Sequence, residues 1–132
     1  MTRLLSLSPD PVRYEGVIRY SSVVMPGVQY AIRKISLGRR IEFARRVREF
    51  AGRLEYHEAG KGVEDRIDAA LAAAEIDALY LRWALAGLFG LSIDGRAASC
   101  EDLIESGPEA LAREIANAIR RECGLSEAEI KN

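Results

Sequence analysis

The side chains that could do chemistry are one histidine, two cysteines and a group of carboxylates in the last third of the chain. His57 is the only histidine, so a multi-histidine metal site is excluded. Cys100 and Cys123 have no neighbouring Cys or His at metal-ligand spacing. A thiol activated by His57 stays open as a possibility, although neither cysteine lies in a recognisable nucleophile turn. We therefore expect reduced thiols and predict no catalytic or cofactor-binding residues.

The carboxylates are dense enough to suggest a divalent cation. They occupy the caps and first turns of predicted helices, where the helix dipole favours acidic side chains in any case. We therefore interpret them as solvated and predict no metal site. They are Asp94, Glu101, Asp102, Glu105 and Glu109.

Charge is divided unevenly along the 132 residues. Residues 1–53 contain 11 Lys and Arg against 4 Asp and Glu, whereas residues 54–132 contain 8 against 16. A predicted helix over residues 36–58 carries an arginine-rich segment, Arg39–Arg53, that could follow a phosphate backbone. Interleaved glutamates form four-apart pairs with two of these arginines. We therefore expect no nucleic-acid partner, and keep a small nucleic-acid-binding protein using Arg39–Arg53 as the alternative function.

The elements that precede this helix are an arm and a hairpin. Residues 1–11 end in Pro9-Asp10-Pro11 and are predicted to form an extended arm. Residues 12–132 fit a single domain with an ordinary apolar content. Within it, a β-hairpin is predicted from Val17–Val24 and Val28–Ile35, because these segments are rich in β-branched and aromatic residues and flank a Pro-Gly turn.

The longest predicted helix begins near Val63 and ends near Phe89-Gly90, and it is apolar on two sides. Such a helix must bury both faces, so it is either the central helix of the domain or is partly covered by another chain. Its main apolar stripe consists of Ile67, Leu71, Ala74, Ala78, Leu81, Leu85 and Leu88. The opposite stripe either packs in the core or forms an aromatic partner-binding patch. These candidate partner-binding residues are Ile76, Leu79, Tyr80 and Trp83.

The last third predicts short helices joined by turns. Asp94-Gly95 is a turn dipeptide, and Ser99 with Asp102 has the spacing of a capping box. Pro108 predicts the start of a helix that ends near Cys123, and Ser126 to Glu129 predicts the start of one more. The predicted fold is therefore α+β and predominantly helical, with an N-terminal β-hairpin followed by two long helices and two to three short C-terminal helices.

The sequence from Tyr30 to its end resembles the phage tail assembly chaperones encoded in bacterial prophages. The order and spacing of several segments carry the resemblance, while residues 1–11 match no feature of the family. The segments are Tyr30–Glu42, Tyr80–Trp83, Gly90–Gly95, Leu103–Leu111 and Leu125–Asn132.

This resemblance implies a non-enzymatic protein that binds the phage tail tape measure protein, and possibly the tail tube protein, during tail assembly. It also implies that the chain forms homo-oligomers. On this view the partner would bind to exposed parts of the Ile76, Leu79, Tyr80 and Trp83 face or to the hairpin edge of Val28–Ile35. No apolar run approaches the roughly 18 residues that span a bilayer, and no signal peptide is recognisable. We therefore expect no membrane partner and a location in the bacterial host cytoplasm.

Overall fold

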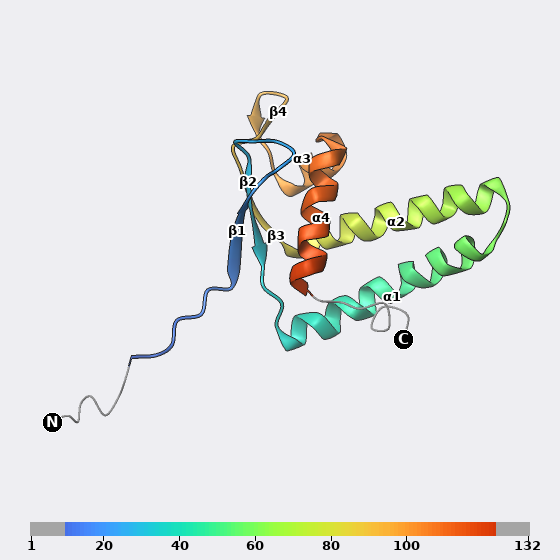
Figure 1. Ribbon diagram of the computed structural model, residues 1–132, viewed down its shortest axis with the longest axis horizontal. Helices are drawn as coiled ribbons and strands as arrows, with labels where there is room; N and C mark the ends of the chain where they lie inside the picture. Colours follow the sequence, from blue (N-terminus) through green and yellow to red (C-terminus); the bar gives the residue numbers. More distant parts are fainter. Residues whose placement is uncertain (1–9, 124–132) are drawn as a thin grey trace.

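In the computed structural model the described residues are 10–123, except for the side chain of His57 (Figure 1). The fold is α+β and predominantly helical, with a small antiparallel sheet near the N-terminus, as the sequence predicts. The predicted helix start at residues 126–129 and most of the predicted arm lie outside the described residues. In chain order the elements are β1 (Val17–Ser21), β2 (Gln29–Arg33), α1 (Leu37–Ala59), α2 (Val63–Ala84), β3 (Leu85–Phe89), β4 (Ser92–Ile93), β5 (Arg96–Ala97), α3 (Cys100–Ser106) and α4 (Glu109–Cys123).

The sheet contains β1, β2 and β3 in that order, and both pairings are antiparallel. The β1–β2 hairpin confirms the predicted one, with Val17 opposite Arg33 and Tyr20 opposite Tyr30. The expectation that the Val28–Ile35 edge is open to a partner is wrong, because β3 pairs with the second edge of β2. The open edge of the hairpin therefore belongs to β1.

The second long helix ends earlier than predicted. α2 ends at Ala84, and Leu85 adopts extended backbone angles (φ −76°, ψ 109°) that begin β3. The apolar spacing of Leu81, Leu85 and Leu88 continues the helical period, but β2 offers a strand partner, and this tertiary pairing overrides the local pattern. Gly87 lies opposite Ala31 of β2, and an added Cβ there would meet the end of the Phe89 ring at 2.8 Å.

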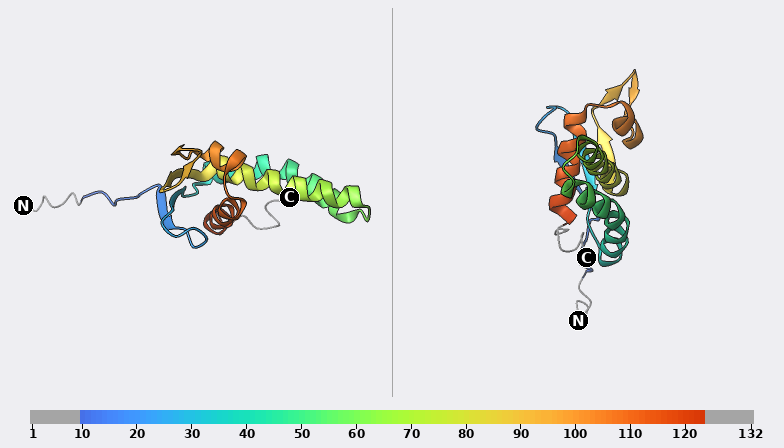
Figure 2. Two further views of the ribbon diagram at one scale, coloured as in Figure 1. Left: turned by 90° about the horizontal axis from the view of Figure 1, so that it is seen from above. Right: turned by 90° about the vertical axis from the view of Figure 1, so that its right-hand side faces the viewer.

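α1 and α2 form an antiparallel helical hairpin, which we divide into a base, where α1 begins and α2 ends, and a tip (Figures 1 and 2). The base lies against the sheet, α3 and α4, while the tip extends away from the sheet. Every long element contributes to one hydrophobic core. No helix within residues 10–123 is long and apolar enough to cross a membrane. The core side chains with the least exposure are Tyr80, Phe43, Ile32, Leu81, Leu103, Leu111, Ile115, Ile119, Val47 and Cys123.

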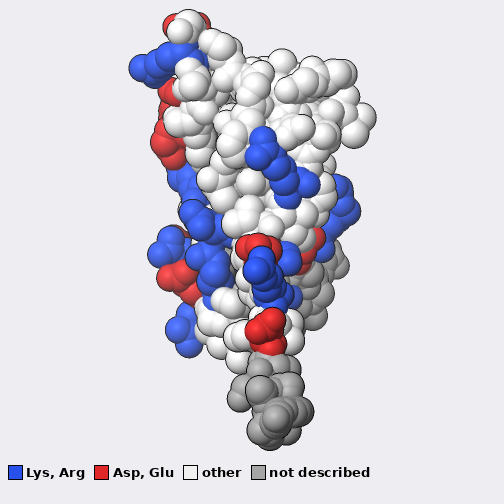
Figure 3. All heavy atoms as spheres, turned by 90° about the vertical axis from the view of Figure 1, so that its left-hand side faces the viewer, with Lys and Arg blue, Asp and Glu red and all other residues white. Residues whose placement is uncertain are grey.

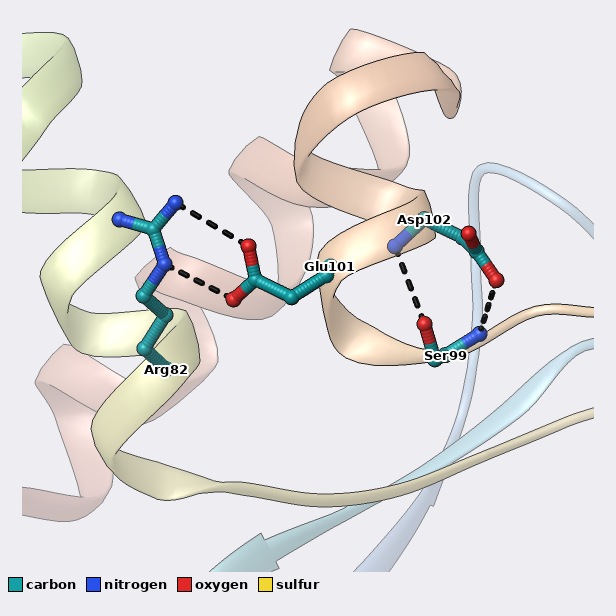
Figure 4. Close-up of polar contacts among 4 residues, drawn as sticks. All are labelled: Arg82, Ser99, Glu101 and Asp102. Atoms are coloured by element: carbon teal, nitrogen blue, oxygen red, sulfur yellow. Dashed lines mark hydrogen bonds and ion pairs between the residues drawn. The ribbon is translucent and has the colours of Figure 1, made fainter.

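The turns and caps of the last third confirm the sequence analysis. Asp94 (φ 50°) and Gly95 (φ 85°) both have positive φ, as the two-residue turn between β4 and β5 requires. At the start of α3, Ser99 Oγ accepts the Asp102 N–H and the Asp102 carboxylate accepts the Ser99 N–H, each at 3.1 Å (Figure 4). α4 begins at Glu109, one residue after Pro108.

Candidate protein-binding surface

One face of α2 is covered by the rest of the fold. Ile76 and Tyr80 retain only 7% and 1% of their exposed surface. The Phe43 ring of α1 lies 4.6 Å from the Tyr80 ring and stacks on Trp83 at 4.0 Å, both measured between centroids. On the other side Arg120 of α4 lies over the Tyr80 ring. This face joins α1, α2 and α4 into the core.

The four predicted partner-binding residues lie on this covered face. Ile76 and Tyr80 are buried, and Leu79 and Trp83 are half-buried against the core. Arg39 further covers Trp83, because its guanidinium lies 4.7 Å from the ring and donates to the Trp83 carbonyl at 2.7 Å. A partner could therefore reach only parts of Leu79 and Trp83 without opening the domain, and their binding role stays a prediction.

The opposite face of α2 carries large aliphatic side chains that nothing described covers. Val63, Ile67 and Leu71 are 62%, 61% and 56% exposed. Their four-residue spacing places them on one side of the helix, in line with the exposed Ala74 and the half-buried Ala78. We call these five residues the α2 stripe. The helix that carries it runs from the tip of the helical hairpin toward α3 and α4 (Figure 1).

The α2 stripe leads into a cavity of about 350 Å³ between α2, α3 and α4. Gly107 ends α3 here with its backbone close to that helix, since a Cβ at this position would lie 2.8 Å from the Leu103 backbone. The walls are mainly aliphatic, with charged groups from both α2 and α4. Stripe and cavity together form a continuous apolar path. The cavity is lined by Ala74, Asp77, Ala78, Leu81, Leu103, Ile104, Gly107, Glu109, Ala112 and Arg113.

No family model and no curated protein matches the sequence, and no solved structure matches the fold. An exposed apolar row beside a cavity is typical of surfaces that bind other molecules.

Ion pairs hold the cavity walls in place. Arg82 of α2 makes two hydrogen bonds to the Glu101 carboxylate of α3, at 2.9 and 3.2 Å (Figure 4). This contact lowers the pKa of the Glu101 carboxyl group, so the carboxylate stays ionised. Asp77 of α2 contacts Arg120 of α4 at 2.5 Å. Both helices that border the cavity beside α2 are therefore linked to α2 by an ion pair: α3 through Glu101 and α4 through Arg120.

Three of the five carboxylates considered as metal ligands, Glu101, Asp102 and Glu109, contact arginines or a helix cap. Asp102 contacts Arg96 at 2.9 Å in addition to its capping bonds, and Glu109 contacts Arg113 within α4 at 2.6 Å. Within the described residues, no three His, Cys, Asp or Glu side chains are arranged to hold a metal ion. These acids therefore act within the fold as ion-pair and cap partners.

The two thiols lie in separate parts of the fold. Burial raises the pKa of the Cys123 thiol to about 11, and burial also raises that of Cys100. Both thiols are therefore protonated at neutral pH, which makes them weak nucleophiles. The end of α1 that carries His57 is at the tip of the helical hairpin, away from α3 and α4 (Figure 1), and the placement of its side chain lies outside the described part.

The arginines of α1 serve mainly as contacts within the fold. Arg46 pairs with Glu42 at 3.6 Å along α1, and Arg53 pairs with Glu75 of α2 at 2.9 Å. Arg39 is held against Trp83 as described above. Three of the six arginines between Arg39 and Arg53 thus make contacts within the fold, two of them with carboxylates.

Proposed function

We propose that this chain is a non-enzymatic assembly chaperone that binds an amphipathic helix of another protein along the α2 stripe. The observation that carries the proposal is the exposed row of Val63, Ile67 and Leu71 on a helix whose opposite face lies in the core. Helix-in-groove recognition uses apolar anchors at this spacing. An apolar row of this kind lowers solubility unless a partner covers it for part of the protein's lifetime.

The partner implied by the sequence resemblance is the tape measure protein of a phage tail. Such a long helical chain exposes apolar faces until the tail tube forms around it, and a chaperone would keep it soluble in that interval. From Val63 to Ala78 the α2 stripe spans roughly 22 Å, long enough to cover about four turns of a bound helix. A large side chain of that helix would enter the cavity beside Leu81 and Leu103.

The alternative of nucleic-acid binding through Arg39–Arg53 has less support. Three of those arginines already contact a carboxylate or a carbonyl of the fold. A nucleic-acid-binding surface would give an affinity for DNA or RNA that falls steeply with salt concentration. A flat salt dependence would exclude it.

Co-expression with the tape measure protein tests the proposal. The soluble fraction of the tape measure protein should rise when this chain is present, and the two proteins should elute together in size-exclusion chromatography. An unchanged soluble fraction would contradict the chaperone function.

A matched pair of double variants assigns the effect to the α2 stripe. Ile67→Glu with Leu71→Glu should abolish the gain in solubility, because two charges would enter the apolar contact. Leu37→Glu with Ile41→Glu makes the same change at exposed positions with the same spacing on α1, and should leave the gain intact. Equal loss in both double variants would show that the stripe is not the binding surface. Light scattering on the same proteins tests the expected self-association.

A further inference from the structure

Strand β1 has one hydrogen-bonding edge that faces away from the sheet. Lys34 donates its backbone N–H to the carbonyl of Gly16 at 2.9 Å, at one end of the hairpin. At the other end Ser22 donates to the carbonyl of Val28 at 2.8 Å. Because bonding direction alternates along an antiparallel ladder, the residues between these ends point alternately toward β2 and away from it. The groups that point away belong to Val17, Arg19 and Ser21.

Among residues 10–123, β1 has no second strand partner. Three consecutive outward positions therefore offer backbone donors and acceptors to another chain. β1 is also exposed at alternate side chains, including Val17 and Arg19, on the face of the sheet away from the core. These features are those of a strand that can pair with an added strand.

The charged side chains on or beside β1 are four basic residues and one acidic residue, Glu15. Figure 3 shows this side of the molecule, where a basic side chain stands within a broad uncharged area and further charged groups lie below it. Arg19 lies 4.0 Å from the Phe89 ring centroid and donates to Gln29 at 2.7 Å, so it is held on the sheet surface. None of the four basic side chains on or beside β1 forms an ion pair with a carboxylate of the described residues. They are Arg13, Arg19, Arg33 and Lys34.

A second copy of this chain does not suit the edge. Antiparallel pairing of two β1 strands about their centre would set Arg19 opposite Arg19 of the other copy. Like charges directly opposite each other on adjacent strands are destabilising. The remaining basic groups of both copies would also be brought together. The charge around the edge instead complements an acidic strand.

We propose that β1 accepts an acidic, extended segment of a partner protein as a fourth strand of the sheet. The backbone groups of Val17, Arg19 and Ser21 would supply the main-chain hydrogen bonds. Acidic side chains of the added strand would lie beside Arg19 on the exposed face of the sheet, while its apolar side chains would lie beside Ile18 and Tyr20 on the other face. This interaction is separate from the α2 stripe and does not depend on the proposed chaperone function.

The experiment uses the full chain and a synthetic peptide in which Glu alternates with Val and Thr. Binding is measured by fluorescence anisotropy, and amide hydrogen exchange is measured by NMR. The acidic peptide should bind and should slow exchange at Val17, Arg19 and Ser21. A peptide with Lys in place of Glu should not bind. Because the contact is charged and exposed, affinity should fall as salt concentration rises.

Ser21→Pro is the decisive variant. Proline removes the outward N–H at this position, keeps the β1–β2 bonds, and is tolerated on edge strands. We expect affinity for the acidic peptide to fall about tenfold. The variant would lose one hydrogen bond to the peptide, and the proline ring would crowd the added strand. Ser21→Ala keeps the N–H and should bind as the unaltered chain does. Thermal unfolding checks that both variants are folded.

Arg19→Glu provides a second measure if Ser21→Pro does not fold. It should weaken binding of the acidic peptide and strengthen binding of the Lys peptide. Ile67→Glu with Leu71→Glu should leave peptide binding unchanged, which separates this edge from the α2 stripe. Absence of binding, or binding without protection of the three outward amides, would overturn the proposal and leave Arg19 with the role of guarding an edge against aggregation.

Discussion

The base and the tip of the α1–α2 hairpin contain similarly apolar residues, yet they differ in what covers them. At the base, Ile76 and Tyr80 are enclosed by α1, the sheet and α4. Toward the tip, Ile67 and Leu71 on the other side of the same helix are more than half exposed. The two regions differ in exposure because α4 contacts α2 only near the base. Its contacts there include Asp77 and Tyr80. An apolar helical face becomes core only where the chain supplies an element to cover it.

Of the substitutions that compare base and tip, Tyr80→Ala at the base should reduce the free energy of unfolding most. The Tyr80 ring is almost fully buried and contacts both Phe43 and Arg120. Its removal leaves a cavity between helices, so the free energy of unfolding should fall by about 3–5 kcal/mol. Urea unfolding followed by circular dichroism measures this change.

Tyr56→Ala is the matched control on the same hairpin, since Tyr56 is 74% exposed. Its effect should be within about 0.5 kcal/mol, as is usual at the surface. If the two tyrosine variants were equally stable, the base would not be the core of the domain.

Glu114→Gln should reduce the free energy of unfolding by an intermediate amount, because Glu114 links α4 to the segment that follows β1. Glu114 accepts a hydrogen bond from the Ser22 hydroxyl at 2.6 Å and from the Val23 N–H at 2.8 Å. Burial alone would raise the pKa of the Glu114 carboxyl group, but these hydrogen bonds and one from Val24 outweigh it and lower the pKa below 4.5. At neutral pH the variant should lose about 1–3 kcal/mol, since hydrogen bonds to a charged group are replaced by poorer ones.

The sign of the pH dependence follows from the lowered pKa of Glu114. The stabilisation by the carboxylate is complete above the unfolded value of 4.5 and is lost as pH falls through the lower folded value. The stability difference between the unaltered chain and Glu114→Gln should therefore shrink in acid, in urea unfolding measured from pH 7 to pH 3. Glu105→Gln, at an exposed position of α3, should show no such difference. A difference that grows in acid would contradict the assigned contacts.

Local signals in the sequence were sufficient for most of the secondary structure. The β1–β2 hairpin, α1 and the capping box of α3 were predicted because each depends on neighbouring residues: a turn, a helical period and a cap. The strand β3 was missed, since Leu85 to Phe89 continues a helical pattern and only its pairing with β2 makes it extended. Non-local pairing of this kind leaves no mark in a local pattern.

The candidate surface was harder to predict for a related reason. The sequence gives α2 two apolar stripes, but it does not state where α4 ends its contact with the helix. Aromatic residues are frequent anchors, so the sequence favours the stripe of Tyr80 and Trp83 as the partner-binding candidate. In the structure these rings lie against Phe43, and the exposed row consists of aliphatic residues. In the sequence, the spacing of Ile67 and Leu71 indicates a second apolar stripe. Only the position of α4 in the fold determines which of the two stripes is exposed.

The smallest effect on stability is expected at the tip, from Ile67→Ala and Leu71→Ala. Each side chain is exposed, and alanine favours the helix, so the free energy of unfolding should change by less than about 0.5 kcal/mol. Ile76→Ala makes the same substitution on the covered face of the same helix and should cost about 2–5 kcal/mol. Urea unfolding of the three variants compares the two faces directly. A large loss at Ile67 would mean that the stripe is covered in the folded protein. Ala variants that stay as stable as the unaltered chain but no longer bind the partner would assign the stripe to recognition, because the row would then contribute to binding and not to folding.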